Sequence, residues 1–406
     1  MFLLIIPLVS TLLVECARCG DAPPPAQLKT YPLHNNPHSA DISPGEKFVV
    51  TEITTNELIE SGTRRITEIV QLWNFKEDRL VAALPLTQFD TKASVTASEL
   101  EPVHIARIVR FSPDGNVVVV IFDQTVYVLR GSDLAEIRRI YPVRPAPVTQ
   151  DYAGLAVTIK SFVNSFEISP NGETLAIFWA SDFTSGRIDL FSLSTGSYIR
   201  GWETPEGWSA SSNGLHWHPN GRFIIVAIPN AKSCQSSTHQ PDIFGFDAET
   251  GATRYRLTSG MDSPRVIVTP DSRVLAVPGP CVHNFSHNHS KLKVFDLISA
   301  KHLHDGSSRV TGVGYSISAS ADGKRFLAFT GEVRKKFDWG DAYFYYVDVD
   351  RKFSVWSLTE YAGIVTSQDV PNLEVTELRL SPNGRYAVSC GKASFIFDLP
   401  KTSVPD

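Results

Sequence analysis

One short stretch of the chain, residues 334–346, combines positive charge with aromatic surface. Arg334 and Lys335 are followed by Trp339 and then by a run of aromatic residues. Guanidinium and ammonium groups beside aromatic faces can bind a sugar, a peptide or an anion. The alternation over residues 343–349 also suits a strand with one buried face. We therefore take Arg334, Lys335 and Trp339 as candidate contacts with a partner.

Two cysteines, Cys234 and Cys281, lie in segments rich in polar residues, glycine and proline. An exported protein could join them in a disulfide, and the alternative is two free, partly buried thiols. The segment after Cys281 also holds three histidines, and imidazoles with a thiolate can bind zinc. No short Cys-x-x-Cys or His-Glu-x-x-His spacing enforces such a site, so we predict no metal. Cys390 follows an apolar run and is expected to be a small buried hydrophobe.

Motifs of catalysis are missing from the sequence. We find no Gly-x-Ser-x-Gly elbow and no glycine-rich phosphate loop, and we predict neither catalytic residues nor a cofactor. Asp348 and Asp350 have strand spacing and are expected to face solvent on one side. The net charge of −5 and the pI of about 6.1 give no general signal for binding polyanions, so nucleic acid is not a predicted partner.

A recurring turn organises the elements that must position these residues. Residues 111–115 read Phe-Ser-Pro-Asp-Gly and lead into the apolar run 117–121. Proline sets φ, Asp or Asn bonds its own backbone, and glycine accepts positive φ, so the run leaving the turn is predicted to be a strand. Related turns recur at a spacing of roughly fifty residues. Their first residues are Ser43, Ser112, Ser169, His218, Thr269, Ser320 and Ser381.

Each repeat has the same internal order. A strand enters the turn, an apolar strand leaves it, a third strand follows a variable loop, and a fourth follows a short turn. No long amphipathic helix interrupts the pattern. A closed array of repeats is an exception to the two or three domains that 406 residues would otherwise suggest. We predict an all-β, seven-bladed β-propeller with four-stranded antiparallel blades.

The last repeat lacks a fourth strand, because only residues 400–406 follow the strand ending at Leu399, and they include Pro400. An open blade would expose a long sheet edge. Residues 27–33 resemble a fourth strand of another repeat. We therefore predict that this N-terminal strand completes the last blade beside residues 395–399.

The repeats from Gln27 to Leu399 resemble the WD40-like and YVTN-type β-propeller superfamily. The Ser-Pro-Asn/Asp-Gly turn and the Phe-Asp-Leu strand ending carry the resemblance, although no repeat has a full Gly-His…Trp-Asp pair. The resemblance implies a non-enzymatic platform for a protein or peptide partner, with no cofactor. The alternative is a lactonase-like enzyme or small-ligand binder with its site at the central channel.

The loops between second and third strands are long in repeats one, four, five and six, and loops of this kind carry binding residues. Cys234 and Cys281 lie in the fourth and fifth of these loops, which neighbouring blades would place side by side. Their disulfide would stabilise the fold by about 4 kcal/mol. Arg334 and Trp339 lie in the sixth loop.

The first residues are almost wholly apolar, so we predict a signal peptide over 1–16, then a proline-rich spacer over 17–26, the propeller over 27–400 and a tail over 401–406. We expect an exported monomer with no stable membrane insertion after signal removal. An intracellular scaffold with a misassigned start is the alternative.

Overall fold

The computed structural model describes residues 29–399, apart from a set of internal segments. The segments left out are 61–62, 93–107, 123, 144, 146–147, 153–154, 160–161, 181–184, 207–214, 229–241, 262–263, 278–292, 306–312, 324, 332–340, 348–352, 358–374 and 392–393. Within the described part, strands dominate, and no helix there is long and apolar enough to cross a membrane.

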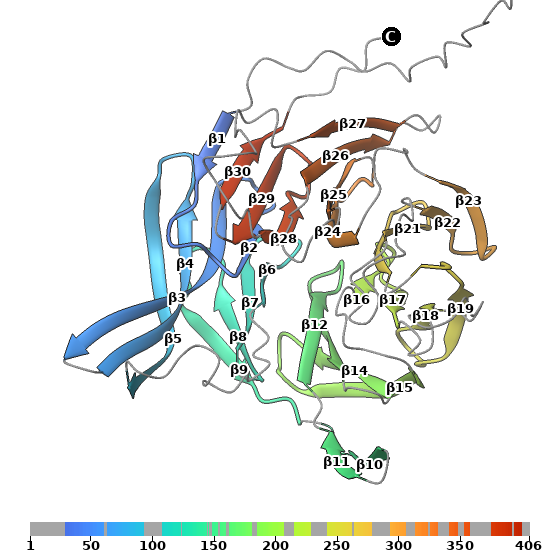
Figure 1. Cartoon of the computed structure of the whole chain (residues 1–406), viewed down its shortest axis with the longest axis horizontal. Coiled ribbons are helices and arrows are strands. Elements are labelled where there is room, and N and C mark those ends of the chain that lie inside the picture. The colour runs from blue at the N-terminus through green and yellow to red at the C-terminus, as the bar shows by residue number, and fades with distance from the viewer. Residues whose placement is uncertain are drawn as a thin grey trace, which may run out of the picture.

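Seven four-stranded antiparallel sheets form the described part of the chain, arranged around a common centre (Figure 1). The first sheet contains β2 (Ser39–Ile42), β3 (Phe48–Glu60), β4 (Thr63–Asn74) and β5 (Arg79–Lys92). The second contains β6 (Ile108–Phe111), β7 (Val117–Phe122), β8 (Thr125–Arg130) and β9 (Glu136–Ile140). The third contains β12 (Phe162–Ile168), β13 (Thr174–Ala180), β14 (Ser185–Ser192) and β15 (Tyr198–Glu206).

The remaining sheets follow in chain order. The fourth contains β16 (Leu215–Trp217), β17 (Phe223–Ala227), β18 (Ile243–Asp247) and β19 (Thr253–Leu257). The fifth contains β20 (Arg265–Val268), β21 (Arg273–Val277), β22 (Lys293–Asp296) and β23 (Lys301–Asp305). The sixth contains β24 (Val313–Ala319), β25 (Arg325–Gly331), β26 (Asp341–Val347) and β27 (Phe353–Ser357). The seventh joins β28 (Val375–Leu380), β29 (Tyr386–Gly391) and β30 (Phe395–Asp398) to β1 (Lys29–Pro32).

The first strand of each sheet contacts the first strand of the next sheet, and β28 contacts β2. These first strands therefore enclose the centre of the molecule. The hydrophobic core lies between neighbouring sheets, and each cluster draws its side chains from two of them. This arrangement confirms an all-β propeller with four-stranded antiparallel blades.

The Ser-Pro-Asp-Gly turn folds as its sequence predicts. The hydroxyl of Ser112 accepts the Val117 N–H at 2.9 Å and donates to the Asp114 carboxylate at 2.5 Å. Gly115 has a φ of 74°, which glycine adopts without strain. The turn leads into β7, whose residues are nearly all buried because the neighbouring sheets cover both of its faces.

The N-terminal strand completes the last sheet, and this prediction is confirmed. β1 pairs antiparallel with β30, with Lys29 opposite Asp398 and Pro32 opposite Phe395. The ring of Tyr31 packs edge-on against Phe75 of the first sheet, with 5.4 Å between centroids. β1 therefore ties the seventh sheet to the first, side by side with β30 in Figure 1.

Two features depart from four short strands per repeat. Residues 148–159 form a separate hairpin of β10 (Val148–Tyr152) and β11 (Leu155–Ile159), outside the seven sheets. The long second-to-third loop predicted in the first repeat is instead a continuation of β3 and β4, which run to residues 60 and 63. The Ile and Thr residues of this segment favour extended backbone, so the strands continue past the core.

Candidate functional site

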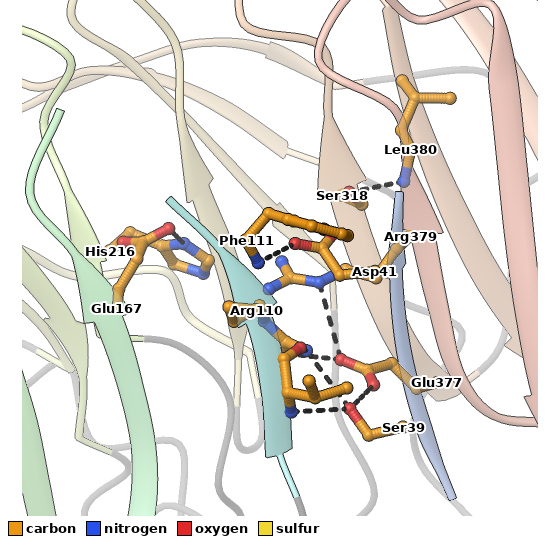
Figure 2. A network of polar contacts seen from close by, with 11 residues as sticks. Ser39, Asp41, Arg110, Phe111, Glu167, His216, Ser318, Glu377, Arg379 and Leu380 are labelled. Atoms are coloured by element: carbon orange, nitrogen blue, oxygen red, sulfur yellow. Dashed lines mark hydrogen bonds and ion pairs between the residues drawn. The ribbon is translucent and has the colours of Figure 1, made fainter. Parts of the chain in front are cut away.

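Polar side chains on the first strands meet at the centre of the ring (Figure 2). In β2, Ala40 and Ile42 enter the core between the first and seventh sheets. Because strand side chains alternate, Ser39 and Asp41 lie on the opposite side, toward the centre. These two residues stand four and two positions before the turn residue Ser43, and equivalent positions in other repeats carry polar residues as well.

Acceptors at these positions bond the backbone of the next sheet. The Phe111 N–H donates to Asp41 Oδ2 at 2.8 Å, and the Leu380 N–H donates to Ser318 Oγ at 3.0 Å. The same bond recurs in three further places: Val109 N–H to Ser39 Oγ, Leu215 N–H to Ser165 Oγ, and Trp217 N–H to Glu167 Oε2. Each bond joins neighbouring first strands, so these side chains hold the ring together.

Arg110 connects three sheets at this centre. Its Nη2 donates to Glu377 Oε1 of the seventh sheet at 2.5 Å. Its Nη1 donates to Ser39 Oγ of the first sheet at 3.2 Å and to its neighbour's carbonyl at 2.7 Å. The Ser39 hydroxyl in turn donates to Glu377 Oε2 at 2.7 Å. Both oxygens of Glu377 therefore already have donors.

Arg379, two positions after Glu377, makes only a longer contact with the same carboxylate. Its Nε lies 3.6 Å from Glu377 Oε1, within range of an ion pair but beyond a hydrogen bond. This Nε is buried and has no hydrogen-bond partner. The side chain is 19% exposed. Arg379 thus brings a largely desolvated guanidinium to the centre, and its Nε has no hydrogen-bond acceptor among the described residues.

Two further features set the charge balance. His216 Nδ1 lies 3.5 Å from Glu167 Oε1, on the side of the view opposite Glu377 (Figure 2). Burial raises the pKa of Asp41 to about 6, against the opposing effects of the Arg110 charge and the bond from the Phe111 N–H. Asp41 therefore gains a proton in a mildly acidic range where ordinary aspartates stay ionised.

The chemistry open to this centre is binding by the guanidinium of Arg379. Asp41 and Glu167 accept backbone N–H bonds, and Glu377 is held by Arg110 and Ser39. A general base needs a carboxylate or imidazole within reach of a reacting proton, and these carboxylates are instead tied to the scaffold. Within the described residues, no group of three or more His, Cys, Asp or Glu is placed to hold a metal ion.

The site residues predicted from the sequence lie elsewhere. Arg334, Lys335 and Trp339 fall in the segment 332–340, and Cys234 and Cys281 fall in 229–241 and 278–292, all outside the described residues. Cys390 is buried on β29 with a free thiol, as predicted, and burial raises the pKa of that thiol.

Sequence reasoning missed the central network, although a signal was present. In three of the first strands, polar residues stand two and four positions before the turn and alternate with apolar ones. They read Ser39 and Asp41, Ser165 and Glu167, and Glu377 and Arg379.

A second candidate surface is the arm formed by the long β3, β4 and β5, which projects from the first sheet (Figure 1, blue). β2 pairs only with residues 49–52 of β3. Among the described residues, no strand pairs with the outer edge of β3 over 53–60. Leu58, near the tip, is 65% exposed. The arm therefore presents open backbone and an apolar side chain outside the ring.

Comparison with known proteins identifies the fold. No family model and no curated protein matches the chain. A chain in the crystal structure of a mitotic checkpoint complex aligns with a TM-score of 0.56 and 12% identity, covering 98% of each chain. Matches extend to 792 chains of solved structures, so the likeness defines the architecture without selecting a function. With the four-stranded sheets, it shows a WD40-like β-propeller fold.

Proposed function

We propose that this protein is a non-enzymatic interaction platform, a closed seven-bladed propeller that binds a protein partner on the arm of its first blade. The observation that carries the proposal is the outer edge of β3, which has no strand partner over residues 53–60 in the described part of the chain. Such an edge is a template for an added strand. Strand addition is a common way to bind an extended peptide segment.

The two edges of the arm differ, and the difference favours β3. On β5, Pro85 and a register shift beside it interrupt the edge, and both are devices that prevent unwanted pairing. β3 carries no proline, lysine or arginine over its thirteen residues. Its pairing with β4 stays regular as far as Leu58. The edge of β3 is therefore the one left able to receive a partner strand.

The end of the propeller that carries the arm supports the same function. In an antiparallel meander, all connections from second to third strands leave the same end of the ring. The connections from β17 to β18, β21 to β22 and β25 to β26 therefore start from the end where the arm begins. The last of these connections contains Arg334, Lys335 and Trp339, so we propose that the partner extends over this end.

The test replaces Leu58, with a matched control on the other end of the ring. Leu58→Asp places a charge beside the open edge of β3. Ile298→Asp also replaces an exposed apolar side chain, 68% exposed, by a charge, but in the turn between β22 and β23. A protein retained by the wild type should lose about tenfold or more in affinity for Leu58→Asp. Ile298→Asp should bind as the wild type does. Equal binding by both variants would refute the role of the arm.

We also propose that the protein is exported, on the strength of the apolar segment over residues 1–14. Export would make the disulfide between Cys234 and Cys281 chemically reasonable. Mass spectrometry of the protein from its source tests both points. Export predicts an N-terminus beyond residue 16 and a disulfide-linked pair of peptides. An intact apolar segment with both thiols free would support the intracellular alternative.

A further inference from the structure

Two arginines of the central network have a buried Nε without a hydrogen-bond partner among the described residues, Arg110 and Arg379. Arg110 still donates through both of its Nη atoms, whereas the guanidinium of Arg379 makes no hydrogen bond within the described part of the chain. Its neighbour Glu377 gives one oxygen to Arg110 at 2.5 Å and the other to Ser39 at 2.7 Å. Arg379 is left with a contact of 3.6 Å to the same carboxylate. A desolvated donor without an acceptor is unfavourable, and an incoming acceptor recovers that loss.

We propose that the centre of the ring binds a small monocarboxylate, with the guanidinium of Arg379 as its principal contact. The planar fork of an arginine matches the two oxygens of a carboxylate, which makes this pairing both strong and directional. The site does not depend on what the arm binds, because it is built from the first strands alone.

The neighbouring charges select a single negative charge on the ligand. Arg110 and Arg379 are balanced by Glu377 and Asp41 when both acids are ionised. A dianion would meet those two carboxylates, whereas a monocarboxylate places one carboxylate against one unsatisfied guanidinium. The other charged or titratable residues on the described first strands are Glu167 and His216, across the ring, and Arg265, the first residue of β20.

Protonation should tighten the binding. Asp41 stands close enough to Arg110 and Glu377 for their charges to act on it, and its proton uptake removes one of the two nearby negative charges. We therefore expect the affinity for a monocarboxylate to rise as pH falls from 7.5 to 5.5. An Asp41→Asn variant isolates the contribution of Asp41 to this pH dependence. Asparagine keeps an oxygen for the Phe111 N–H.

The experiment is a titration of the full chain with sodium acetate at constant ionic strength, followed by the Nε–Hε resonances of ¹⁵N-labelled arginine. The resonance of Arg379, identified by its absence from Arg379→Lys, should shift and saturate. Arg379→Lys should weaken binding about 10- to 100-fold, as expected when a charged hydrogen-bonded pair is lost. Arg385, in the turn between β28 and β29, is paired with Asp398 at 3.2 Å, so Arg385→Lys should bind acetate like the wild type.

Several results would overturn the proposal. A shift that does not saturate, or one reproduced by chloride, would mean that no site exists. Tighter binding of inorganic phosphate than of acetate would refute the selection of a monoanion. An equal loss in Arg379→Lys and Arg385→Lys would show that Arg379 is not the contact. If Arg379→Lys does not fold, Asp41→Asn still tests the proposal. An unchanged rise in the affinity for acetate at low pH in Asp41→Asn would contradict the stated role of Asp41.

Discussion

Closure of the ring can be tested at Tyr31, the residue of β1 that contacts both joined sheets. Its ring lies 5.4 Å from Phe75 of the first sheet and 6.5 Å from Tyr386 of the seventh, edge-on in each case. Lys29 lies over the same ring at 4.8 Å. Tyr31→Ala removes all three contacts while leaving the backbone pairing of β1 with β30 possible.

The expected cost follows from these contacts. Truncation of a fully buried aromatic residue costs about 3–5 kcal/mol, and Tyr31 is half-buried, so the lower part of that range applies. Each aromatic pair contributes about 0.5–1.5 kcal/mol within that total. We expect the free energy of unfolding to fall by about 3 kcal/mol. For a chain of about 400 residues, this corresponds to a fall in Tm of about 4 °C.

Calorimetry on wild type and variant measures both quantities, with Tyr198→Ala as the control. Tyr198 is also a strand tyrosine with an aromatic neighbour, Phe191 at 5.7 Å, but it lies within the third sheet and is 52% exposed. Its replacement should cost about 1 kcal/mol. If Tyr31→Ala costs no more than Tyr198→Ala, β1 does not hold the ring closed and the reasoning fails.

Two further perturbations address the buried charges. Burial raises the pKa of Asp242 from 3.8 to about 6. Between these values Asp242 keeps its proton in the folded state and has lost it in the unfolded state. The contribution of Asp242 to stability therefore falls as pH rises from about 4 to about 6. Relative to wild type, the free energy of unfolding of Asp242→Asn in urea should therefore gain about 2.4 kcal/mol between pH 4 and pH 7, and a constant difference would contradict this. Glu377→Gln removes the charge that Arg110 contacts at 2.5 Å, so the free energy of unfolding should fall by about 2 kcal/mol. An unchanged midpoint of urea unfolding would refute a stabilising role for this pair.

The sequence allowed the repeat and its closure to be predicted because both depend on local chemistry. Proline, Asp or Asn, and glycine fix the turn wherever they occur together, and the missing fourth strand of the last repeat requires a donor such as residues 29–32. The arm could not be separated from a loop, because residues 56–59 have a strand composition but are exposed and add nothing to the core.

The central network was harder to predict for a different reason. The residue two positions before the turn differs among the sheets: it is Asp41, Arg110, Glu167, His216, Ile267, Ser318 or Arg379. Where these residues have a polar partner, it lies on another sheet and far away in sequence, so no repeated residue type marks the site. Glu377 and Arg110 show this best, since 267 positions separate them.

The central claim is that a protein partner adds a strand to the open edge of β3. Hydrogen exchange of the backbone amides of residues 53–60, measured with and without the partner that the wild type retains, tests it most directly. Strand addition predicts slowed exchange at alternate residues of this segment, where the amides point away from β4, with Ile298 and its turn unchanged. Unchanged exchange over 53–60, with protection confined to other parts of the ring, would contradict the account.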